Sequence, residues 1–216
     1  MKRLFIFFTL IVCLLSACTK ARDQMGFISD GSNSTITAIV TVRQDADSQV
    51  YFQVSENICL YPVNYKEPFT GPCRIICEIQ IDSERKSCSV IWMDYLQEGT
   101  VQNTPPGKGD GVDILDDWMT CLEDGYLTLH YFTLWGDGSV PHTLTLVTGE
   151  NPEDPYEVRL VHQSNGDAPL EEGDALIYFD LKDLPPTGEN GQTLTLKWTN
   201  KAGNEIRRSF FFKSRQ

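Results

Sequence analysis

The sequence predicts an all-β protein built from two β domains in succession. Apolar residues recur at every second position, as at Leu144 and Leu146, which alternate with threonines, and at Leu194, Leu196 and Trp198. A period of two is the pattern of a strand with one buried face. The runs are rich in β-branched and aromatic residues, and turn-forming Gly, Pro, Asn and Asp separate them. No run indicates a helix longer than one turn.

The first domain, residues 34–107, is predicted to be a small OB-like five-stranded barrel. Five short strands in so few residues suit a closed barrel of this type. The alternative is an open meander that packs only against the second domain. The expected strands span residues 35–44, 49–55, 58–63, 73–82 and 87–95.

A segment rich in proline and glycine, Thr104–Gly111, is predicted to join the two domains. Pro105 and Pro106 cannot donate hydrogen bonds to a strand ladder, and the glycines that follow interrupt any periodicity. We therefore expect residues 108–216 to form the second domain.

The second domain is predicted to be an immunoglobulin-like seven-stranded β-sandwich, without the cysteine–tryptophan–cysteine signature of true immunoglobulin domains. Its most apolar stretch, residues 113–135, is expected to fold back on itself at Glu123-Asp124-Gly125. Asp-Gly favours a type I′ hairpin turn, in which both central residues have positive φ. The other expected strands span residues 142–148, 156–163, 174–181, 192–200 and 205–213.

The N-terminus indicates export and lipidation. Met1-Lys2-Arg3 is positively charged, and residues 4–15 are apolar but too few to span a bilayer as a helix. Leu15-Ser16-Ala17-Cys18 resembles the bacterial lipobox, which implies a lipoprotein signal peptide at 1–17, a lipidated Cys18 and a tether at 18–33. The alternatives are an ordinary signal peptide in which Cys18 is incidental, and a retained transmembrane anchor.

The charge of the chain disfavours nucleic acid as a partner. The formal charge is −12, and loss of Lys2 and Arg3 with the signal peptide makes it −14. Nucleic-acid binding requires a basic surface, and so does electrostatic docking on anionic lipid. Membrane attachment must then come from acyl chains, of which two or more are needed for stable anchoring.

Five cysteines remain in the mature chain after Cys18, and we interpret most of them as small buried core residues. Cys73 and Cys77 would lie too far apart on one strand to bridge each other. A bridge from Cys59 to either of them is the best disulfide candidate. The five are Cys59, Cys73, Cys77, Cys88 and Cys121.

No motif of an enzyme, cofactor site or metal site is recognised, so catalytic, cofactor-binding and metal residues are predicted to be none. His130 and His142 would lie diagonally on one face if residues 136–138 formed a hairpin turn, and two such histidines could hold a metal. A loop site for calcium is the other metal possibility. Its candidate ligands are Asp110, Asp113, Asp116, Asp117, Glu171, Glu172 and Asp174.

Several segments together give a resemblance to the NigD-like lipoproteins of Bacteroidetes. They are WMTCLEDGYLTLHYFTLWG, PHTLTLV, DPYEVRLVHQSNGD, IYFDLKDLPP and TLTLKW. The resemblance implies a lipoprotein with an N-terminal OB domain and a C-terminal β-sandwich, a possible role in bacteriocin immunity, and no catalytic residues. In that phylum an acidic cluster after the lipidated cysteine accompanies surface export. Its absence here favours the outer membrane, facing the periplasm.

Three functions are compatible with these observations. The first is a non-enzymatic, lipid-anchored cell-envelope protein that binds a protein or peptide. The second is a glycan-binding accessory lipoprotein, which requires exposed aromatic side chains. Its candidates are the strand residues Trp92, Trp118, Trp135 and Trp198, and Tyr61, Tyr65 and Phe69, which flank a Pro-rich loop. The third is a hydrolase, which requires carboxylates or histidines that converge in a cleft.

Overall fold

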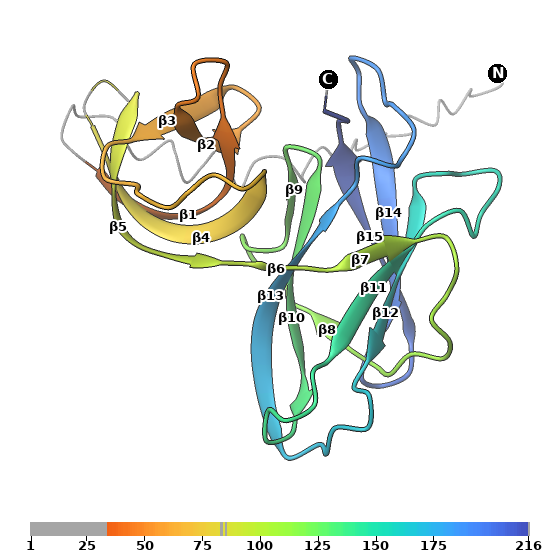
Figure 1. Cartoon of the computed structure of the whole chain (residues 1–216). Helices are drawn as coiled ribbons and strands as arrows, with labels where there is room; N and C mark the ends of the chain where they lie inside the picture. The colour runs from red at the N-terminus through yellow and green to blue at the C-terminus, as the bar shows by residue number, and fades with distance from the viewer. Residues whose placement is uncertain (1–33, 83, 85, 216) are drawn as a thin grey trace, which may run out of the picture.

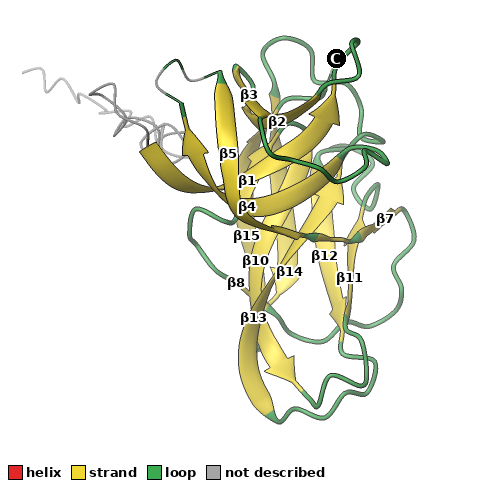
Figure 2. Cartoon of the chain, turned by 60° about the vertical axis from the view of Figure 1, so that its left-hand side comes forward, coloured by secondary structure: helices red, strands yellow, loops and turns green. Residues whose placement is uncertain are grey.

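The protein is all-β, as predicted, and its two domains stand side by side (Figures 1 and 2). The structure is a computed structural model that describes residues 34–215 except 83 and 85. The signal peptide, Cys18 and the tether therefore lie outside the described residues. Within the described part of the chain there is no helix long and apolar enough to cross a membrane.

The first domain is a closed barrel of five strands, which confirms the OB-like architecture and excludes the open meander. The strand order is β1-β2-β3-β5-β4, and β4 pairs with β1 to close the barrel. The strands are β1 (Ser34–Gln44), β2 (Val50–Ser55), β3 (Ile58–Pro62), β4 (Cys73–Ile81) and β5 (Ser87–Tyr95).

Alternation along β4 shows how the sequence fills this barrel. Ile75, Cys77, Ile79 and Ile81 point inward and are buried. The residues between them point outward, and among these Arg74 is buried because it faces the second domain. A β-bulge lies in β5 opposite Glu78 and Ile79, where the ladder between β4 and β5 shifts register.

The second domain is a sandwich of two five-stranded sheets. One sheet has the order β6-β13-β10-β8, with β9 pairing the other end of β10, and the second has the order β15-β14-β12-β11-β7. The first sheet contains β6 (Gln97–Glu98), β8 (Asp113–Ile114), β9 (Cys121–Glu123), β10 (Tyr126–Trp135) and β13 (Glu171–Asp180). The second contains β7 (Thr100–Gln102), β11 (Thr143–Val147), β12 (Glu157–Gln163), β14 (Gln192–Thr199) and β15 (Glu205–Phe212).

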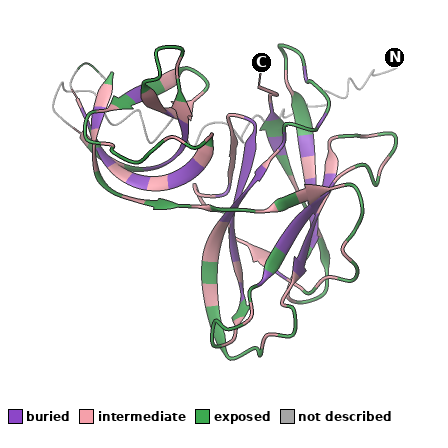
Figure 3. Cartoon of the chain, viewed as in Figure 1, coloured by how far each residue is buried: buried purple, intermediate pink, exposed green. Residues whose placement is uncertain are grey.

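The core of the sandwich lies between these sheets, where the buried colour is concentrated in Figure 3. Leu127, Leu129 and Phe179 come from the first sheet, and Leu146 and Leu196 come from the second; all five are completely buried. The predicted alternation is confirmed by this arrangement, because one face of each strand supplies the core.

The predicted hairpin turn at Asp124-Gly125 is confirmed. Asp124 and Gly125 have φ values of 53° and 74°, and Glu123 pairs directly with Tyr126 across the turn. The arm before the turn is shorter than expected, because only β8 and β9 are strands there. Residues 115–120 between them are not in a strand, and residues 117–120 form turns and bends.

The chain enters the sandwich earlier than the Pro-Gly segment suggests. β6 pairs in parallel with β13, and β7 pairs in parallel with β11, so residues 97–102 already belong to the two sandwich sheets. Figure 1 shows this run continuing from β5 across the sandwich, from beside β13 to beside β11. Gly99 lies between β6 and β7, where a Cβ atom would overlap the ring of the buried Phe179. Thr104–Gly111 is a loop between β7 and β8, apart from one bridge of Asp110 to His162.

Charged side chains of the barrel hold the turn of the hairpin. The guanidinium of Arg43 on β1 donates two hydrogen bonds, of 2.9 and 2.8 Å, to the carboxylate of Asp124. The guanidinium of Arg74 donates to Thr41 Oγ1 at 3.0 Å and lies 5.8 Å from the centre of the Tyr126 ring. The hairpin predicted to organise the second domain therefore also joins it to the first.

Candidate functional site

The two histidines considered as a metal pair do not come together. β10 pairs with β13 along its whole length and not with β11, which belongs to the other sheet. The hairpin across residues 136–138 on which the metal pair depended is therefore not formed, and His130 and His142 have separate sets of partners. The chain crosses between sheets at this turn, which no local pattern in the sequence indicates.

His130 is held between two carboxylates. Its Nδ1 lies 2.6 Å from Asp117 Oδ2, and its Nε2 lies 2.8 Å from Asp174 Oδ2. Asp117 belongs to the segment between β8 and β9, and Asp174 to the neighbouring strand β13. His130 thereby ties residues 115–120 to the sheet. Both ring nitrogens are already occupied by protein partners.

His142 belongs to a second, more deeply buried network. Its Nε2 lies 3.0 Å from Asp167 Oδ2, and its Nδ1 lies 3.0 Å from His162 Nε2. The indole of Trp135 stacks on the imidazole of His142, with ring centres 4.3 Å apart. The side chains of His142 and Asp167 are 1% and 5% exposed, so this chain of contacts is shielded from solvent.

The two networks are expected to respond to pH in opposite directions. Burial lowers the pKa of His130, but the hydrogen bonds to Asp174 and Asp117 outweigh it, and the pKa is raised above 6.5. Burial, with the neighbouring His142, lowers the pKa of His162 below 6.5. The folded chain thus favours a charged His130 and a neutral His162.

The sign of each effect on stability follows from linkage. The contribution of His130 is fully present below pH 6.5 and is lost as the pH rises through its folded pKa. The contribution of His162 is present above pH 6.5 and is lost as the pH falls through its folded pKa. We expect His130→Gln to destabilise more at about pH 5.5 than at about pH 8.5, and His162→Gln to do the reverse. Urea denaturation of both variants at both pH values checks this, and equal losses at the two pH values would contradict it.

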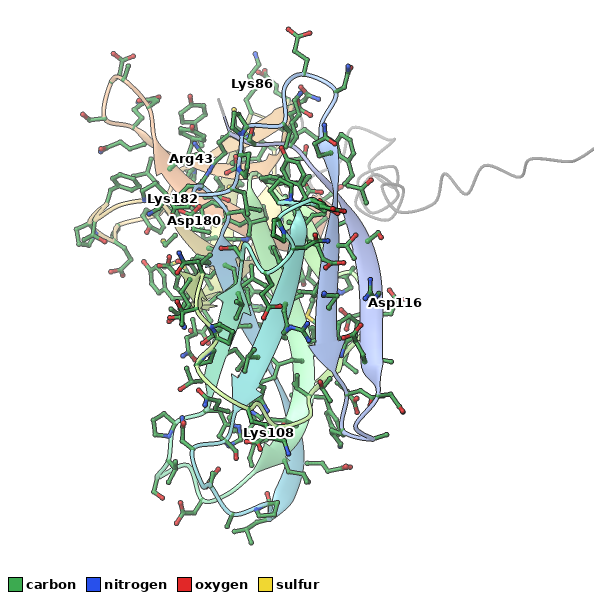
Figure 4. The ribbon with its side chains drawn as sticks, turned by 90° about the vertical axis from the view of Figure 1, so that its right-hand side faces the viewer. Arg43, Lys86, Lys108, Asp116, Asp180 and Lys182 are labelled. Carbon is green, nitrogen blue, oxygen red and sulfur yellow. The ribbon has the colours of Figure 1, made fainter. Side chains whose placement is uncertain are left out.

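The acidic residues considered for calcium have protein partners spread over several elements. Asp110 accepts hydrogen bonds from Ser164, and Glu172 forms an ion pair with Lys201. Asp116 forms an ion pair with Arg208 of β15, and Figure 4 shows it on the flank of the sandwich, far from Arg43. Among the described residues, no group of three or more His, Cys, Asp or Glu side chains is placed to hold a metal ion.

The described cysteines are all free, so the bridge from Cys59 is wrong. Only two of the five, Cys77 and Cys88, are buried in the barrel core, which is fewer than expected, and Cys73 and Cys121 are partly buried. Burial raises the pKa values of Cys77 and Cys88 to about 12 and about 11. Side chains alternate along β3, and because Leu60 points inward and is buried, the neighbouring Cys59 points outward and is exposed. Its partner in the ladder is Gln53 rather than another cysteine.

The four tryptophans divide into core and surface residues. Trp198 is buried, and Trp135 is partly buried and donates from Nε1 to Gly173 O at 3.0 Å. Trp118 is also partly buried. Trp92 on the barrel is exposed, and its Nε1 donates to Glu78 Oε2 at 2.8 Å. Of the four tryptophans, Trp92 alone is exposed, so they do not form the exposed aromatic row that the glycan-binding hypothesis predicts.

The main exposed apolar surface lies on the outside of the barrel, and we call it the barrel face. It consists of Tyr61 and Val63 on and after β3, and Ile91 and Trp92 on β5, which are 37%, 71%, 56% and 43% exposed. The strands carrying them are neighbours, because β3 pairs with β5 and Val63 N donates to Cys88 O. Sequence inspection singled out Tyr61 and Trp92 but missed Val63 and Ile91, whose exposure depends on the bulge and on barrel closure.

Comparison with known proteins identifies the family. Residues 97–212, more than half of the chain, match the family model described as NigD-like C-terminal beta sandwich domain. The architecture defines the class: all-β proteins in which a small closed barrel precedes a β-sandwich. The chain belongs to the NigD-like family, and the resemblance found in the sequence is confirmed. A search of curated proteins finds no match.

Solved structures share this fold at low sequence identity. A "Putative TOXIN related protein" from Parabacteroides distasonis has a TM-score of 0.69 and 20% identity, with 84% of this chain and 94% of that one covered. A NigD-like immunity protein from Bacteroides caccae has a TM-score of 0.58 and 20% identity, with 81% and 92% covered. A "Putative lipoprotein" from Bacteroides fragilis has a TM-score of 0.59 and 12% identity, with 85% and 100% covered. At these identities the likeness shows the fold alone.

Proposed function

We propose that this protein is a lipid-anchored component of the cell envelope that binds a protein or peptide partner through the barrel face, without catalysis. The observation that carries the proposal is the concentration of exposed apolar side chains on Tyr61, Val63, Ile91 and Trp92. Contiguous apolar surface of this kind is typical of interaction sites in soluble domains. Under this proposal residues 1–17 are removed, Cys18 carries the lipid and residues 18–33 form the tether.

Two features support binding rather than catalysis. Both ring nitrogens of His130 and of His142 have protein partners, which leaves neither imidazole with a free nitrogen for a substrate. Two cavities among the described residues are also small. One of about 80 Å³ is lined by residues around Gly125 and Phe212, and one of about 70 Å³ lies at the turn between β4 and β5. Sites for small molecules are usually several times larger.

An immunity-related role is the specific form of this function that the family suggests. One structural relative carries the name of a NigD-like immunity protein and another that of a lipoprotein. We place the protein at the outer membrane, facing the periplasm. In that role, deletion of the gene should make cells sensitive to a bacteriocin produced by neighbours. Unchanged resistance to every co-resident bacteriocin would remove the immunity role and leave partner binding intact.

The binding function is tested by crosslinking in the native envelope. A photo-reactive amino acid at Val63 of the full-length, lipidated protein should give a discrete crosslinked partner. The same amino acid at Leu170, which is 67% exposed on the sandwich, is the matched control. A partner captured equally from both positions, or from neither, would contradict binding at the barrel face.

Glycan binding is the alternative, because Tyr61 and Trp92 offer exposed rings on the barrel face. Aromatic rings can stack on sugar faces, and OB folds bind oligosaccharides in other proteins. Calorimetry with a panel of glycans distinguishes the two functions. Sugar binding that is lost in Trp92→Ala would favour the glycan function over the protein partner.

A further inference from the structure

The barrel face combines apolar side chains with carboxylates placed directly beside them. We propose that its ligand is a cationic peptide segment, in which apolar side chains contact Tyr61, Val63, Ile91 and Trp92 while lysine or arginine side chains pair with Asp45, Glu78 and Asp94. This inference rests on the proposed function, and it names the chemistry of the partner.

The apolar part of the face is produced by the bulge in β5. Val90 is paired with Ile79, and Trp92 with Glu78, so Ile91 is the extra residue. A bulge brings successive side chains to the same side of a sheet, where strict alternation would separate them. Ile91 and Trp92 are accordingly both exposed, although they are consecutive residues. Their apolar surface is therefore available to a partner at one place on the barrel.

Hydrogen bonds fix the bulge against the end of β3. The side chain of Asn64 donates from Nδ2 to Val90 O at 2.9 Å and accepts from Val90 N at 2.8 Å through Oδ1. This pair of bonds joins Asn64, the residue after Val63, to Val90, the residue before Ile91. A surface held in its binding geometry loses little conformational entropy when a ligand binds.

Three carboxylates border the apolar residues. Asp45 Oδ2 accepts from Tyr61 Oη at 3.2 Å, and Glu78 Oε2 accepts from Trp92 Nε1 at 2.8 Å. Asp94 is exposed and lies two residues beyond Trp92 on the same strand, and therefore on the same side of it. Each of these carboxylates keeps acceptor capacity for an additional donor, because a carboxylate can accept about four hydrogen bonds.

Among the described cations of the barrel, Lys66 is exposed three residues after Val63, and the other three are directed elsewhere. Arg43 is paired with Asp124, and Arg74 is buried against the sandwich. Lys86 lies at the turn before β5, 3.8 Å from Glu84. The chain as a whole carries a formal charge of −12, so its long-range field also attracts cations. Opposite charges beside an apolar centre are the arrangement that gives an interface its specificity and association rate.

The proposal is tested with a synthetic peptide in which lysines alternate with leucine and tryptophan. A charge-reversed analogue carries glutamate in place of each lysine. Binding is measured by calorimetry on the whole mature chain, with Cys18→Ser so that no lipid competes for the peptide. We expect the cationic peptide to bind and the glutamate analogue to bind at least about tenfold more weakly. Raising the salt concentration should weaken the binding of the cationic peptide and not that of the glutamate analogue.

Substitutions then locate the binding site. Val63→Ser and Ile91→Ser should each weaken the cationic peptide about tenfold, because each removes one apolar contact. Leu170→Ser on the sandwich should leave binding unchanged, since Leu170 is equally exposed but remote from the barrel face. Glu78→Gln and Asp94→Asn together should weaken binding of the cationic peptide several-fold and make that binding less dependent on salt. Glu153→Gln on the sandwich should change neither the affinity nor the salt dependence. These residues are exposed or partly exposed, so near-UV circular dichroism is expected to show the same fold in every variant.

Each contrary outcome has a distinct meaning. Equal affinity for the two peptides, or equal losses in Val63→Ser and Leu170→Ser, would overturn the cationic ligand. A crosslinked partner at Val63 in the envelope, combined with no binding of the cationic peptide, would overturn this inference and leave the proposed function standing. Peptide binding without any crosslinked partner would instead count against the proposed function.

Discussion

Replacing Asp167 with alanine is expected to reduce the free energy of unfolding by about 3 kcal/mol or more. Asp167 Oδ2 accepts hydrogen bonds from Gly136 N at 2.6 Å and from His142 Nε2 at 3.0 Å. Alanine leaves both groups without their acceptor in a region closed to water, and each buried unpaired donor costs about 1–3 kcal/mol. The His142 ring also packs between Trp135 and His162, so the loss should spread through the network.

Asp167→Asn separates hydrogen bonding from charge. A single oxygen of Asp167 receives both hydrogen bonds, and the amide oxygen of asparagine can occupy the same place. We expect Asp167→Asn to lose about 1 kcal/mol, well below the loss in the alanine variant. Asp137→Ala is the matched control, because Asp137 follows Gly136 in the loop between β10 and β11 and its exposed side chain accepts a local hydrogen bond from Ser139 N, so its loss should be far smaller. Urea denaturation measures all three, and an alanine variant as stable as the parent would show that the network does not hold the sheets together.

The strands of the barrel were predictable because their signals are local, whereas closure of the barrel depends on the distant pairing of β1 with β4. The strands expected at 35–44 and 87–95 are found at Ser34–Gln44 and Ser87–Tyr95, since β-branched runs and turn residues mark them in the sequence. The hairpin turn was predictable for the same reason. A type I′ turn needs positive φ at both central residues, and Asp124 and Gly125 are residue types that adopt it. Each of these features is decided within about ten residues of chain.

The sandwich pairing depends on contacts that the local sequence does not contain. β10 has a turn after it and a strand-like run beyond, yet its partner is β13, with Trp135 opposite Glu171. Gln97 and Glu98 are both polar, and they form a strand only because they pair with Ile177 and Tyr178 of β13. For these short or distant pairings the hydrophobic pattern gives no register, and tertiary packing decides.

The candidate sites follow the same division. Tyr61 and Trp92 were recognised as aromatic candidates, but their neighbours Val63 and Ile91 were not, because exposure at a bulge is a property of the closed barrel. The histidines were recognised as titratable groups, but their partners come from other elements: Asp174 is 44 positions from His130 along the chain. A residue type can be read from the sequence, whereas its partner requires the fold.

Arg74 of the barrel also contacts the sandwich, so its side chain links the two domains. Arg74→Met is expected to lower the free energy of unfolding by about 2 kcal/mol near neutral pH. Arg74 is 1% exposed, and its guanidinium contacts Thr41 within the barrel and Cys121 of the sandwich, at 3.0 and 3.8 Å. Methionine keeps most of the packing volume and removes the charge and the donors. The loss therefore measures the polar contacts rather than a cavity.

The pH dependence of this loss identifies the group that Arg74 compensates. Burial raises the pKa of Glu123 above 4.5, and the neighbouring Arg74 opposes that rise. Because the folded chain holds the proton more tightly than the unfolded chain, Glu123 lowers stability as the pH rises from about 4.5 through its folded pKa. Without Arg74 the pKa of Glu123 rises further, and the loss of stability that Glu123 causes at neutral pH becomes larger.

We expect Arg74→Met to lower the free energy of unfolding more near pH 7 than near pH 4.5. In the double variant, Glu123→Gln should remove this difference. Urea denaturation of the four proteins at both pH values measures the coupling. A loss from Arg74→Met that is the same at both values would show that Arg74 acts by packing alone, and that the buried charge does not join the barrel to the sandwich.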